Sequence, residues 1–430
     1  MPSAPSSSSI ERNFAEWALF LLVALCAWHG QWMVHSANPF EFLRHGSDNL
    51  GYYQWLPAAF IDHDFDRMYW CHQMEDGKWI SMFTMGVAVL QLPFFLIGHF
   101  FANAMGYPVN GFSSPYAVFI MLGASTYAGA GCVLAYKLAA RFAGRLPAML
   151  AAVVLFAATN LIYYSVHEPL YSHVYSFFLI GLFCWCALRI LDGPRPVHVM
   201  LMVLSGGLMV LVRQLNVIVL LFPLMMAWTS PAGLRGLWRN LMAQRTVFLL
   251  STVLVLVPYI LQMAYWDHIT GNPLTFTYGR KGEHFEFDKM VPGMVLFSVR
   301  NGWLVYTPVM LPVMVLLAGS AWRGVGPARP VLAIVTFTWL MYSAWWCWWL
   351  GTSFSHRGFV DHYALLAIPL AWLFRSVLQR AWSLRLVTGI LLVMAIKLNF
   401  GMMERFDWLW SWHEWTWQKL FEQVSAIVTG

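Results

Sequence analysis

Acidic and aromatic side chains gather after the first apolar run, in the segment SDNLGYYQWLPAAFIDHDFD that covers residues 47–66. A carboxylate such as Asp48 can accept a proton from a hydroxyl nucleophile. Tyr52 and Tyr53 are aromatic candidates for substrate contact. Asp64 is a second candidate for substrate contact, and the aspartates around it could bind a divalent cation through oxygen ligands. A helix-capping Asp48 and a plain polar turn are the simpler alternatives.

One arginine interrupts the long apolar run 197–228: Arg213 lies between Gly206-Gly207 and Pro223. An arginine at membrane depth is energetically costly and is usually functional. Its planar guanidinium can hold a phosphate group through two parallel hydrogen bonds. Snorkelling to the lipid headgroups, or pairing with a structural acid, are the alternatives. We predict that Arg213 contacts a phosphate or another part of a substrate.

Three further segments place charged, histidine and aromatic side chains between apolar runs, namely HEPLYSH (167–173), the loop 267–301 and SFSHRGFVDHY (353–363). The arginines are secondary candidates for phosphate binding and the other polar residues for substrate binding. They are Arg300, Arg357, His167, Glu168, His173, Glu283, His284, His356 and Asp361. Interfacial polar groups, a structural Arg–Asp pair and a charged surface loop are the respective alternatives.

The composition places the chain in a membrane. It has 430 residues, of which 59% are hydrophobic and 11% charged, whereas globular domains carry about 25% charged residues. The 24 tryptophans and 17 tyrosines suit the two membrane–water interfaces, where these residues collect. The net charge of +6 does not indicate nucleic-acid binding, because most basic residues lie in the loops between apolar runs. We predict an all-α polytopic membrane protein.

A bilayer-spanning helix needs about 20 apolar residues. The candidate spans are 14–35, 116–139, 147–164, 171–191, 246–266, 302–320, 331–350, 363–375 and 384–403. The run 197–228 is too long for one span and has basic residues at both ends, which stay in the cytoplasm. We therefore expect it to enter and return as two short helices that meet at Arg213 near the outer headgroups.

The run 79–101 is long enough to span, but crossing would place Lys137, Arg141 and Arg145 outside. We therefore predict a surface or re-entrant helix there and about 11 transmembrane helices, with the N-terminus cytoplasmic and the C-terminus extracytoplasmic. The predicted organisation has three parts. They are a disordered N-terminus (1–13), a transmembrane domain (14–403) with outer loops 36–78, 267–301 and 351–362, and an interfacial tryptophan-rich tail (404–430).

In order along the chain, six stretches resemble the GT-C superfamily of integral-membrane glycosyltransferases, and most closely bacterial members related to protein mannosyltransferases and aminoarabinose transferases. The stretches are SDNLGYYQWLPAAFIDHDFD, FTMGVAVLQLPFFLIGH, HEPLYSHVYSFF, VRQLN, FSVRNGWLVYTP and SFSHRGFVDHYALLAIPLA. The resemblance implies a polyprenyl-phosphate-linked sugar donor and an extracytoplasmic glycan, lipid or protein acceptor. It also implies an acidic catalytic base in the first outer loop, which corresponds to Asp48.

The expected activity is therefore glycosyl transfer in the inner (plasma) membrane, with Arg213 as the first choice for the donor phosphate. Such a leaving group requires no cofactor, and a divalent metal remains an option. A transporter or flippase of a lipid-linked sugar is the alternative, which would favour repeated halves and polar sites at mid-membrane. A non-catalytic scaffold would leave Arg213 unexplained.

Overall fold

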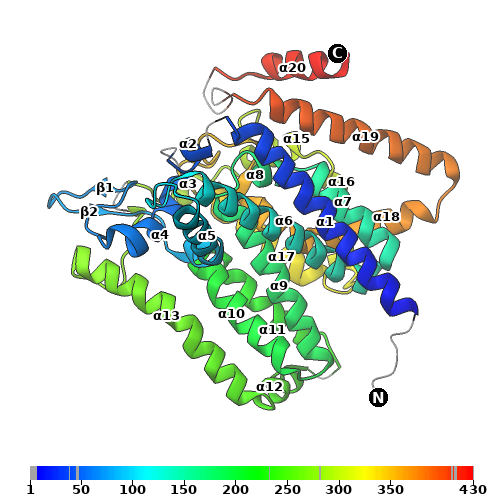
Figure 1. Cartoon of the computed structure of the whole chain (residues 1–430). Helices are drawn as coiled ribbons and strands as arrows, with labels where there is room; N and C mark the ends of the chain where they lie inside the picture. Colours follow the sequence, from blue (N-terminus) through cyan, green and yellow to red (C-terminus); the bar gives the residue numbers. More distant parts are fainter. Residues whose placement is uncertain are drawn as a thin grey trace.

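The computed structural model of the chain consists of helices and, in the part that it describes, one two-stranded sheet. The described residues are 7–37, 39–44, 48–231, 233–279, 282–407, 410 and 414–429. In the sheet, β1 (His72–Gln73) pairs antiparallel with β2 (Trp79–Ile80). The helix α13 (Arg245–Thr270) forms one edge of the molecule, and α19 (Trp382–Glu404) with α20 (Trp417–Thr429) forms another (Figure 1).

Between these edges lies a core of packed helices. It comprises α1 (Ser7–His35), α6 (Ser114–Ala143), α7 (Arg145–Ala157), α9 (Ser172–Asp192), α10 (Pro196–Val212) and α18 (Tyr363–Leu378). Small residues on α6 let its neighbours approach closely. A Cβ atom at Gly129 would lie 2.9 Å from the carbonyl oxygen of Phe20 on α1, and one at Gly131 would lie 2.4 Å from the ring of Phe177 on α9.

The contacts along α6 define two ends of this core. Helix α1 runs antiparallel to α6, because Phe20 faces Gly129 while Glu16 pairs with Lys137. Helix α9 runs parallel to α6, since Phe177 faces Gly131 while Asp192 pairs with Arg141. We call the end with His35, Ser114 and Ser172 the pocket end, after the cavity described below, and the end with Asn13, Ala143 and Asp192 the far end.

The helices fit an all-α membrane protein, but the predicted count of about 11 transmembrane helices is wrong. Among the described residues, six helices are long and apolar enough to cross a bilayer. They are Asn13–His35, Gly86–Ala104, Ser114–Ala143, Ser172–Asp192, Arg245–Thr270 and Trp382–Glu404. The count rises to seven if the bent pair Gln214–Trp228 and Gly233–Met242 forms one span.

Several predicted spans are shorter because the chain breaks inside them. Helices α7, α16 (Met310–Trp322) and α17 (Ala328–Ser343) are shorter than the predicted spans 147–164, 302–320 and 331–350, whereas α10 and α18 are about as long as expected or longer. All five have 13 to 17 residues. At about 1.5 Å per residue they cover about 20–26 Å, less than the bilayer core of about 30 Å.

Two of these breaks have a local cause. In the run 147–164, the Thr159 hydroxyl accepts the Leu161 N–H at 3.2 Å and so competes with helical bonding. In the run 302–320, Thr307 precedes Pro308, and a residue before proline disfavours the helical conformation. A hydropathy pattern does not register either break.

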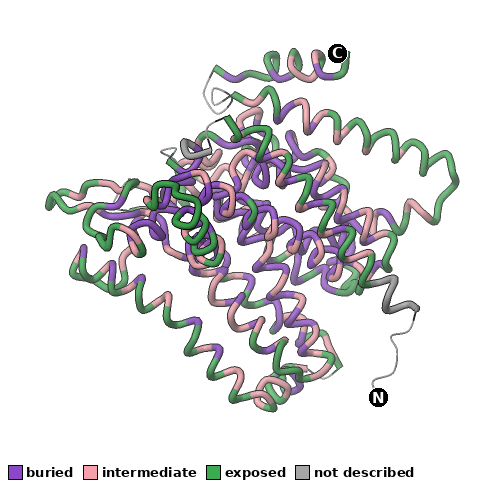
Figure 2. Tube along the Cα trace, in the orientation of Figure 1, coloured by how far each residue is buried: buried purple, intermediate pink, exposed green. Residues whose placement is uncertain are grey.

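The outermost helices leave apolar side chains uncovered. In the most apolar stretch of each helix, only 22% of the residues are buried for α1 and only 17% for α13 and for α19. Figure 2 shows long exposed stretches on α13 and α19, whereas the central helices are mostly buried. Exposed faces of this size are unusual in soluble proteins, and they suit contact with lipid tails.

The helix α5 (Gly86–Ala104) packs on the half of α6 nearest the pocket end. A Cβ atom at Gly98 would lie 2.9 Å from Cα of Tyr116, and the Tyr127 hydroxyl donates to the Leu90 carbonyl oxygen at 2.8 Å. The segment between α1 and α6 thus begins and ends at the pocket end, and the last turns of α5 lie at that end. Helix α5 is long and apolar enough to span a bilayer, so the re-entrant course of 79–101 stays a prediction.

The run 197–228 forms two short helical segments that meet at Arg213, as predicted. Helix α10 ends at Val212, Arg213 is extended, and a 3₁₀ segment η2 (Gln214–Leu221) leads into α11 (Phe222–Trp228). The chain folds back, because a Cβ atom at Gly206 would lie 3.4 Å from Leu220. Arg213 therefore stands at the turn of a hairpin.

The remaining helical elements are short. They are α2 (Pro39–Arg44), α3 (Asp48–Tyr53), α4 (Trp55–Pro57), η1 (Ala58–Asp62), α8 (Leu161–Val166), α12 (Gly233–Met242), η4 (Phe287–Lys289), α14 (Pro292–Phe297), α15 (Trp303–Tyr306) and η5 (Arg357–His362). Helix α1 begins at Ser7, inside the range 1–13 that the sequence analysis expected to be disordered. Residues 1–6 lie outside the described part. In the tail, α20 packs against α19.

Candidate functional site

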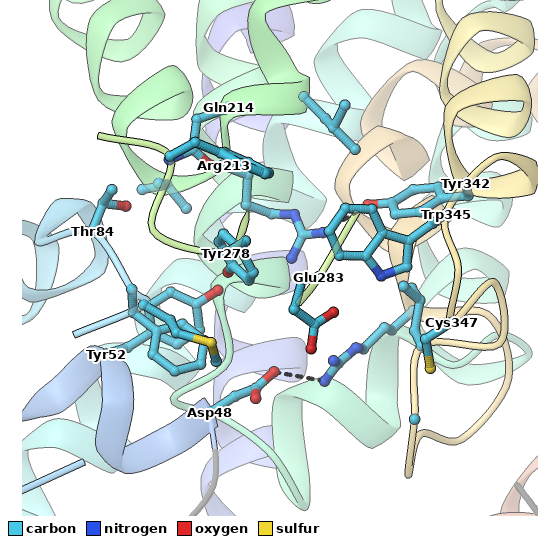
Figure 3. A pocket seen from close by; sticks show the side chains of 18 of the residues that line it. Asp48, Tyr52, Thr84, Arg213, Gln214, Tyr278, Glu283, Tyr342, Trp345 and Cys347 are labelled. Atoms are coloured by element: carbon cyan, nitrogen blue, oxygen red, sulfur yellow. Dashed lines mark hydrogen bonds and ion pairs between the residues drawn. The ribbon is translucent and has the colours of Figure 1, made fainter. Parts of the chain in front are cut away.

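A cavity of about 290 Å³ lies where α3, the α10–η2 turn, the end of α17 and the loop before η5 meet. Its lining joins charged and hydroxyl groups to an apolar wall (Figure 3). The polar members include Asp48, Tyr52, Thr84, Arg213, Tyr278, Glu283, Tyr342 and Arg357, and the apolar members include Phe83, Val212, Leu215, Phe276 and Phe285. The pocket therefore has the mixed character of a site for an amphipathic ligand.

Asp48 and Arg357 form an ion pair inside this pocket. Asp48 is the first residue of α3, and its Oδ2 lies 2.9 Å from Nη1 of Arg357. The Arg357 guanidinium also lies over the Tyr171 ring, 5.0 Å from its centroid. Burial alone would lower the pKa of Arg357, but the Asp48 carboxylate raises it above its ordinary value. Arg357 therefore stays charged and holds Asp48 in place.

Arg213 is held by three different partners. Its Nε lies 3.1 Å from Oδ2 of Asp361, its Nη1 donates to Oγ of Ser172 at 3.1 Å, and its Nη2 donates to the Tyr342 hydroxyl at 2.7 Å. The Tyr52 hydroxyl donates to the same Ser172 oxygen at 3.1 Å. Arg213 is thus fixed at the pocket wall, and its contact with Asp361 is the pairing with an acid that the sequence analysis gave as an alternative.

Asp361 and His173 support Arg213 from behind. The Nδ1 atom of His173 lies 2.7 Å from Oδ1 of Asp361, and both side chains are buried. The two oxygens of Asp361 therefore serve different neighbours, and neither residue lines the pocket. Buried charges are found in proteins when they are paired and hydrogen-bonded, which is the condition met here.

Glu283 provides a second carboxylate in the pocket. Its Oε2 accepts a hydrogen bond from Nε1 of Trp346 at 2.7 Å, and Figure 3 shows the carboxylates of Glu283 and Asp48 both pointing into the cavity. The structure thus brings together four predicted charged residues, Asp48, Arg213, Glu283 and Arg357, from four separate stretches of the chain.

Glu168 and His167 lie next to the pocket without lining it. Oε2 of Glu168 accepts a hydrogen bond from Nδ2 of Asn49, the neighbour of Asp48, at 2.6 Å. Burial raises the pKa of Glu168 to about 7, against the opposite effect of the Asn49 hydrogen bond. Burial lowers the pKa of His167 to about 4, and its ring stacks on Tyr163 at 4.9 Å. His167 is therefore neutral at pH 7.

Three more predicted substrate contacts also lie outside the pocket lining. Tyr53 points away from Tyr52 because adjacent helical residues differ by about 100°, and its hydroxyl donates to the Gly111 carbonyl oxygen. Asp64 lies in an exposed turn and accepts the Asp66 N–H at 2.8 Å. His284 is exposed and lies 3.4 Å from Glu286.

Two further predicted residues are held elsewhere by aromatic neighbours. The Arg300 guanidinium lies 4.0 Å from the centroid of the Trp349 ring, away from the pocket. His356 is buried and its Nε2 lies 2.9 Å from the Trp348 carbonyl oxygen. Both contacts involve the tryptophan-rich stretch that follows α17, which the sequence prediction assigned to a span. Arg300 therefore does not line the cavity that Arg213 and Arg357 share.

Several pocket residues escaped the sequence prediction. Tyr342, Tyr278 and Trp345 line the cavity, and Ser172 binds both Arg213 and Tyr52. Ser172 lay in the singled-out segment HEPLYSH, whereas Tyr342 fell inside a predicted span, where a single tyrosine gives no signal. Among the described residues, no three His, Cys, Asp or Glu side chains gather so as to hold a metal ion.

Comparison of the chain with known protein families and with characterised proteins found no match.

Proposed function

We propose that the chain is a membrane glycosyltransferase that moves a sugar from a polyprenyl-phosphate donor to an acceptor hydroxyl. The observation that carries this proposal is the shared pocket, in which the Asp48 carboxylate and the Arg213 guanidinium face one cavity that also has an apolar wall. A carboxylate can take a proton, a guanidinium can hold a phosphate, and an apolar wall can accompany a prenyl chain.

The reaction assigns a role to each group. The acceptor hydroxyl oxygen attacks the anomeric carbon, and its proton passes to Asp48. The bond between the anomeric carbon and the phosphate oxygen breaks, and its electron pair leaves with polyprenyl phosphate. The charge that develops on that phosphate is stabilised by donors already directed at it, which Arg213 supplies while Asp361 and Ser172 hold its position.

Arg357 connects the base Asp48 to the proposed phosphate position beside Arg213. Its guanidinium pairs with Asp48 at 2.9 Å and lines the same cavity as Arg213. A donor phosphate would share the Arg357 guanidinium and so loosen its hold on Asp48. Asp48 would thus be freer to meet the acceptor hydroxyl once the donor is bound.

The membrane arrangement follows from the same proposal. The pocket end faces the extracytoplasmic side, the N-terminus is cytoplasmic and α5 does not cross the bilayer. Cysteine-accessibility labelling decides this, with single cysteines at positions 110 and 143 of an otherwise cysteine-free protein. Labelling of position 110 from outside and of position 143 from inside is the expected result. The reverse pattern would overturn the topology.

Mass spectrometry of lipid-linked sugars and envelope glycans tests the activity, in cells with and without the protein. If the protein is the proposed enzyme, the sugar-loaded lipid should accumulate and one glycan modification should disappear when the protein is absent. Purified protein should also release polyprenyl phosphate from the donor. A flippase of lipid-linked sugar would instead move the donor between leaflets of a vesicle and leave its sugar–phosphate bond intact, which would reject the proposal.

A further inference from the structure

A second cavity, of about 540 Å³, lies at the far end of the helical core. The last turns of α6 and α9 and the first turns of α7 and α10 surround it together with the start of α1. Its lining includes Glu16, Lys137, Arg141, Arg145, Arg189 and His198. The proposed transfer reaction uses none of these residues.

Basic groups outnumber acidic groups around this cavity. Lys137 lies 2.8 Å from Glu16. Arg141 and Arg189 share Asp192, with Arg141 donating through Nη1 at 2.7 Å and through Nη2 at 2.6 Å.

Arg145 makes no ion pair within the described part of the chain. In addition, Nδ1 of His198 is buried and has no hydrogen-bond partner. The cavity therefore offers an anion the charge of Arg145, unpaired among the described residues, and the unbonded Nδ1 atom of His198.

The surroundings of the cavity are apolar and exposed. Phe14 and Trp17 on α1 are 75% and 64% exposed, and Leu146 beside Arg145 is 60% exposed. These side chains neighbour lining residues along the same helices. Inside the cavity, the Arg189 guanidinium lies over the Trp185 ring at 5.7 Å. Basic groups bordered by lipid-facing aromatic side chains are what a phospholipid headgroup meets at a membrane surface.

We propose that this cavity binds the headgroup phosphate of an anionic phospholipid from the leaflet at the far end. The phosphate would lie between Arg145 and Arg141, and the acyl chains would follow the exposed faces of α1 and α7. A soluble anion could use the same cationic groups but would gain nothing from Phe14, Trp17 and Leu146. The inference depends on membrane insertion and not on the proposed transfer reaction.

Native mass spectrometry of the purified full-length protein tests the site, with phosphatidylglycerol, phosphatidylcholine of the same chains and glycerol 1-phosphate as probes. The parent should retain phosphatidylglycerol preferentially. Arg145→Gln should weaken that binding about fivefold, which corresponds to the roughly 1 kcal/mol that one basic residue contributes near a charged membrane surface. Arg145→Lys keeps the charge and should bind like the parent.

Arg375→Gln is the matched control, because Arg375 is exposed on α18 and lies outside the cavity lining. It should leave phosphatidylglycerol binding unchanged. Equal retention of the two phospholipids by the parent, or parent-like binding by Arg145→Gln, would overturn the proposal. Displacement of phosphatidylglycerol by an equal concentration of glycerol 1-phosphate would assign the cavity to a soluble anion and overturn it as well. High salt offers a measurement without substitution, since it should abolish the preference for phosphatidylglycerol.

Discussion

The two ends of the core both carry arginine–carboxylate pairs, but the pairs differ in their exposure to water. At the pocket end the side chains of Arg213 and Arg357 are 19% and 16% exposed, and each has its own aspartate. At the far end Arg141 and Arg189 are 31% and 33% exposed and share one aspartate. Removing one partner of a buried pair is costly, whereas exposed pairs contribute little. The same residue types therefore give a fixed arrangement at one end and an adjustable basic surface at the other.

The largest effect is expected for the base. Asp48→Asn keeps the shape of the side chain but removes the proton acceptor, so the transfer rate should fall by about 10²–10⁴. The measurement is release of polyprenyl phosphate by purified protein. Asp64→Asn makes the same chemical change in an exposed turn and should behave like the parent. A parent-like rate in Asp48→Asn would remove Asp48 from the mechanism and direct attention to Glu283.

Next in size is the effect of removing the Arg213 charge. Composition alone suggests that Arg213→Met eases membrane insertion, because a central arginine costs about 2.5–3.5 kcal/mol on insertion scales. The structure indicates an opposing loss of stability, because the substitution leaves buried Asp361 without its guanidinium partner. Breaking a buried pair costs about 3–5 kcal/mol. We expect Arg213→Met to unfold more readily in detergent and to lose binding of a polyprenyl-phosphate analogue.

The double variant Arg213→Met with Asp361→Asn separates these two effects. It should recover much of the lost stability, because the amide removes the unpaired charge, but it should not recover binding. Arg213→Lys keeps the charge without the planar fork and should retain binding in part. Parent-like affinity of Arg213→Met for the analogue would mean that Arg213 is only structural.

Glu168 predicts a pH dependence of stability. Burial raises the pKa of Glu168 to about 7 from 4.5, so the folded protein binds this proton more tightly than the unfolded chain does. Stability from this group is fully present below about pH 4.5 and falls as the pH rises through about 7. The free energy of unfolding of Glu168→Gln, relative to that of the parent, should therefore rise by up to about 3 kcal/mol as the pH increases from about 4.5 to about 7. Thermal unfolding at pH 5 and pH 8 checks this, and an unchanged difference across that range would contradict it.

The smallest effect is expected at the far end. Arg141→Gln removes two hydrogen bonds to Asp192, yet exposed pairs typically contribute less than about 1 kcal/mol. The midpoint of thermal unfolding should therefore change much less than for Arg213→Met. If the two variants were equally destabilised, the contrast between the two ends would not hold.

The sequence was informative where one residue type is costly in its context. Arg213 stood out because it interrupts an apolar run, and the structure places it at the turn between two short helices. Asp48 stood out as an aspartate just beyond the first apolar run, and it lines the pocket. Its pairing with Arg357 could not be predicted, because the two residues lie far apart along the chain. They meet because η5 packs against α9 and the Tyr52–Ser172 hydrogen bond joins α3 to α9.

The failures have equally specific causes. Arg300 has the same charge as Arg357, but the tryptophans after α17 hold it away from the pocket. Tyr53 follows Tyr52 directly, and one step of helical rotation turns it into a separate hydrophobic cluster. Two of the predicted spans failed because hydropathy does not register the helix breaks near Thr159 and Thr307. Apolar composition identifies which segments are buried or face lipid, while side-chain hydrogen bonds and prolines decide where each helix stops.

The support of Arg213 by Asp361, Ser172 and Tyr342 has a consequence for how fast and how tightly a ligand can bind. A free arginine side chain loses up to about 2 kcal/mol of rotamer entropy when it is immobilised. Here that loss has already occurred during folding, so an arriving phosphate does not have to order the guanidinium. Association should then be limited by diffusion of the lipid within the bilayer plane and by release of water from the pocket.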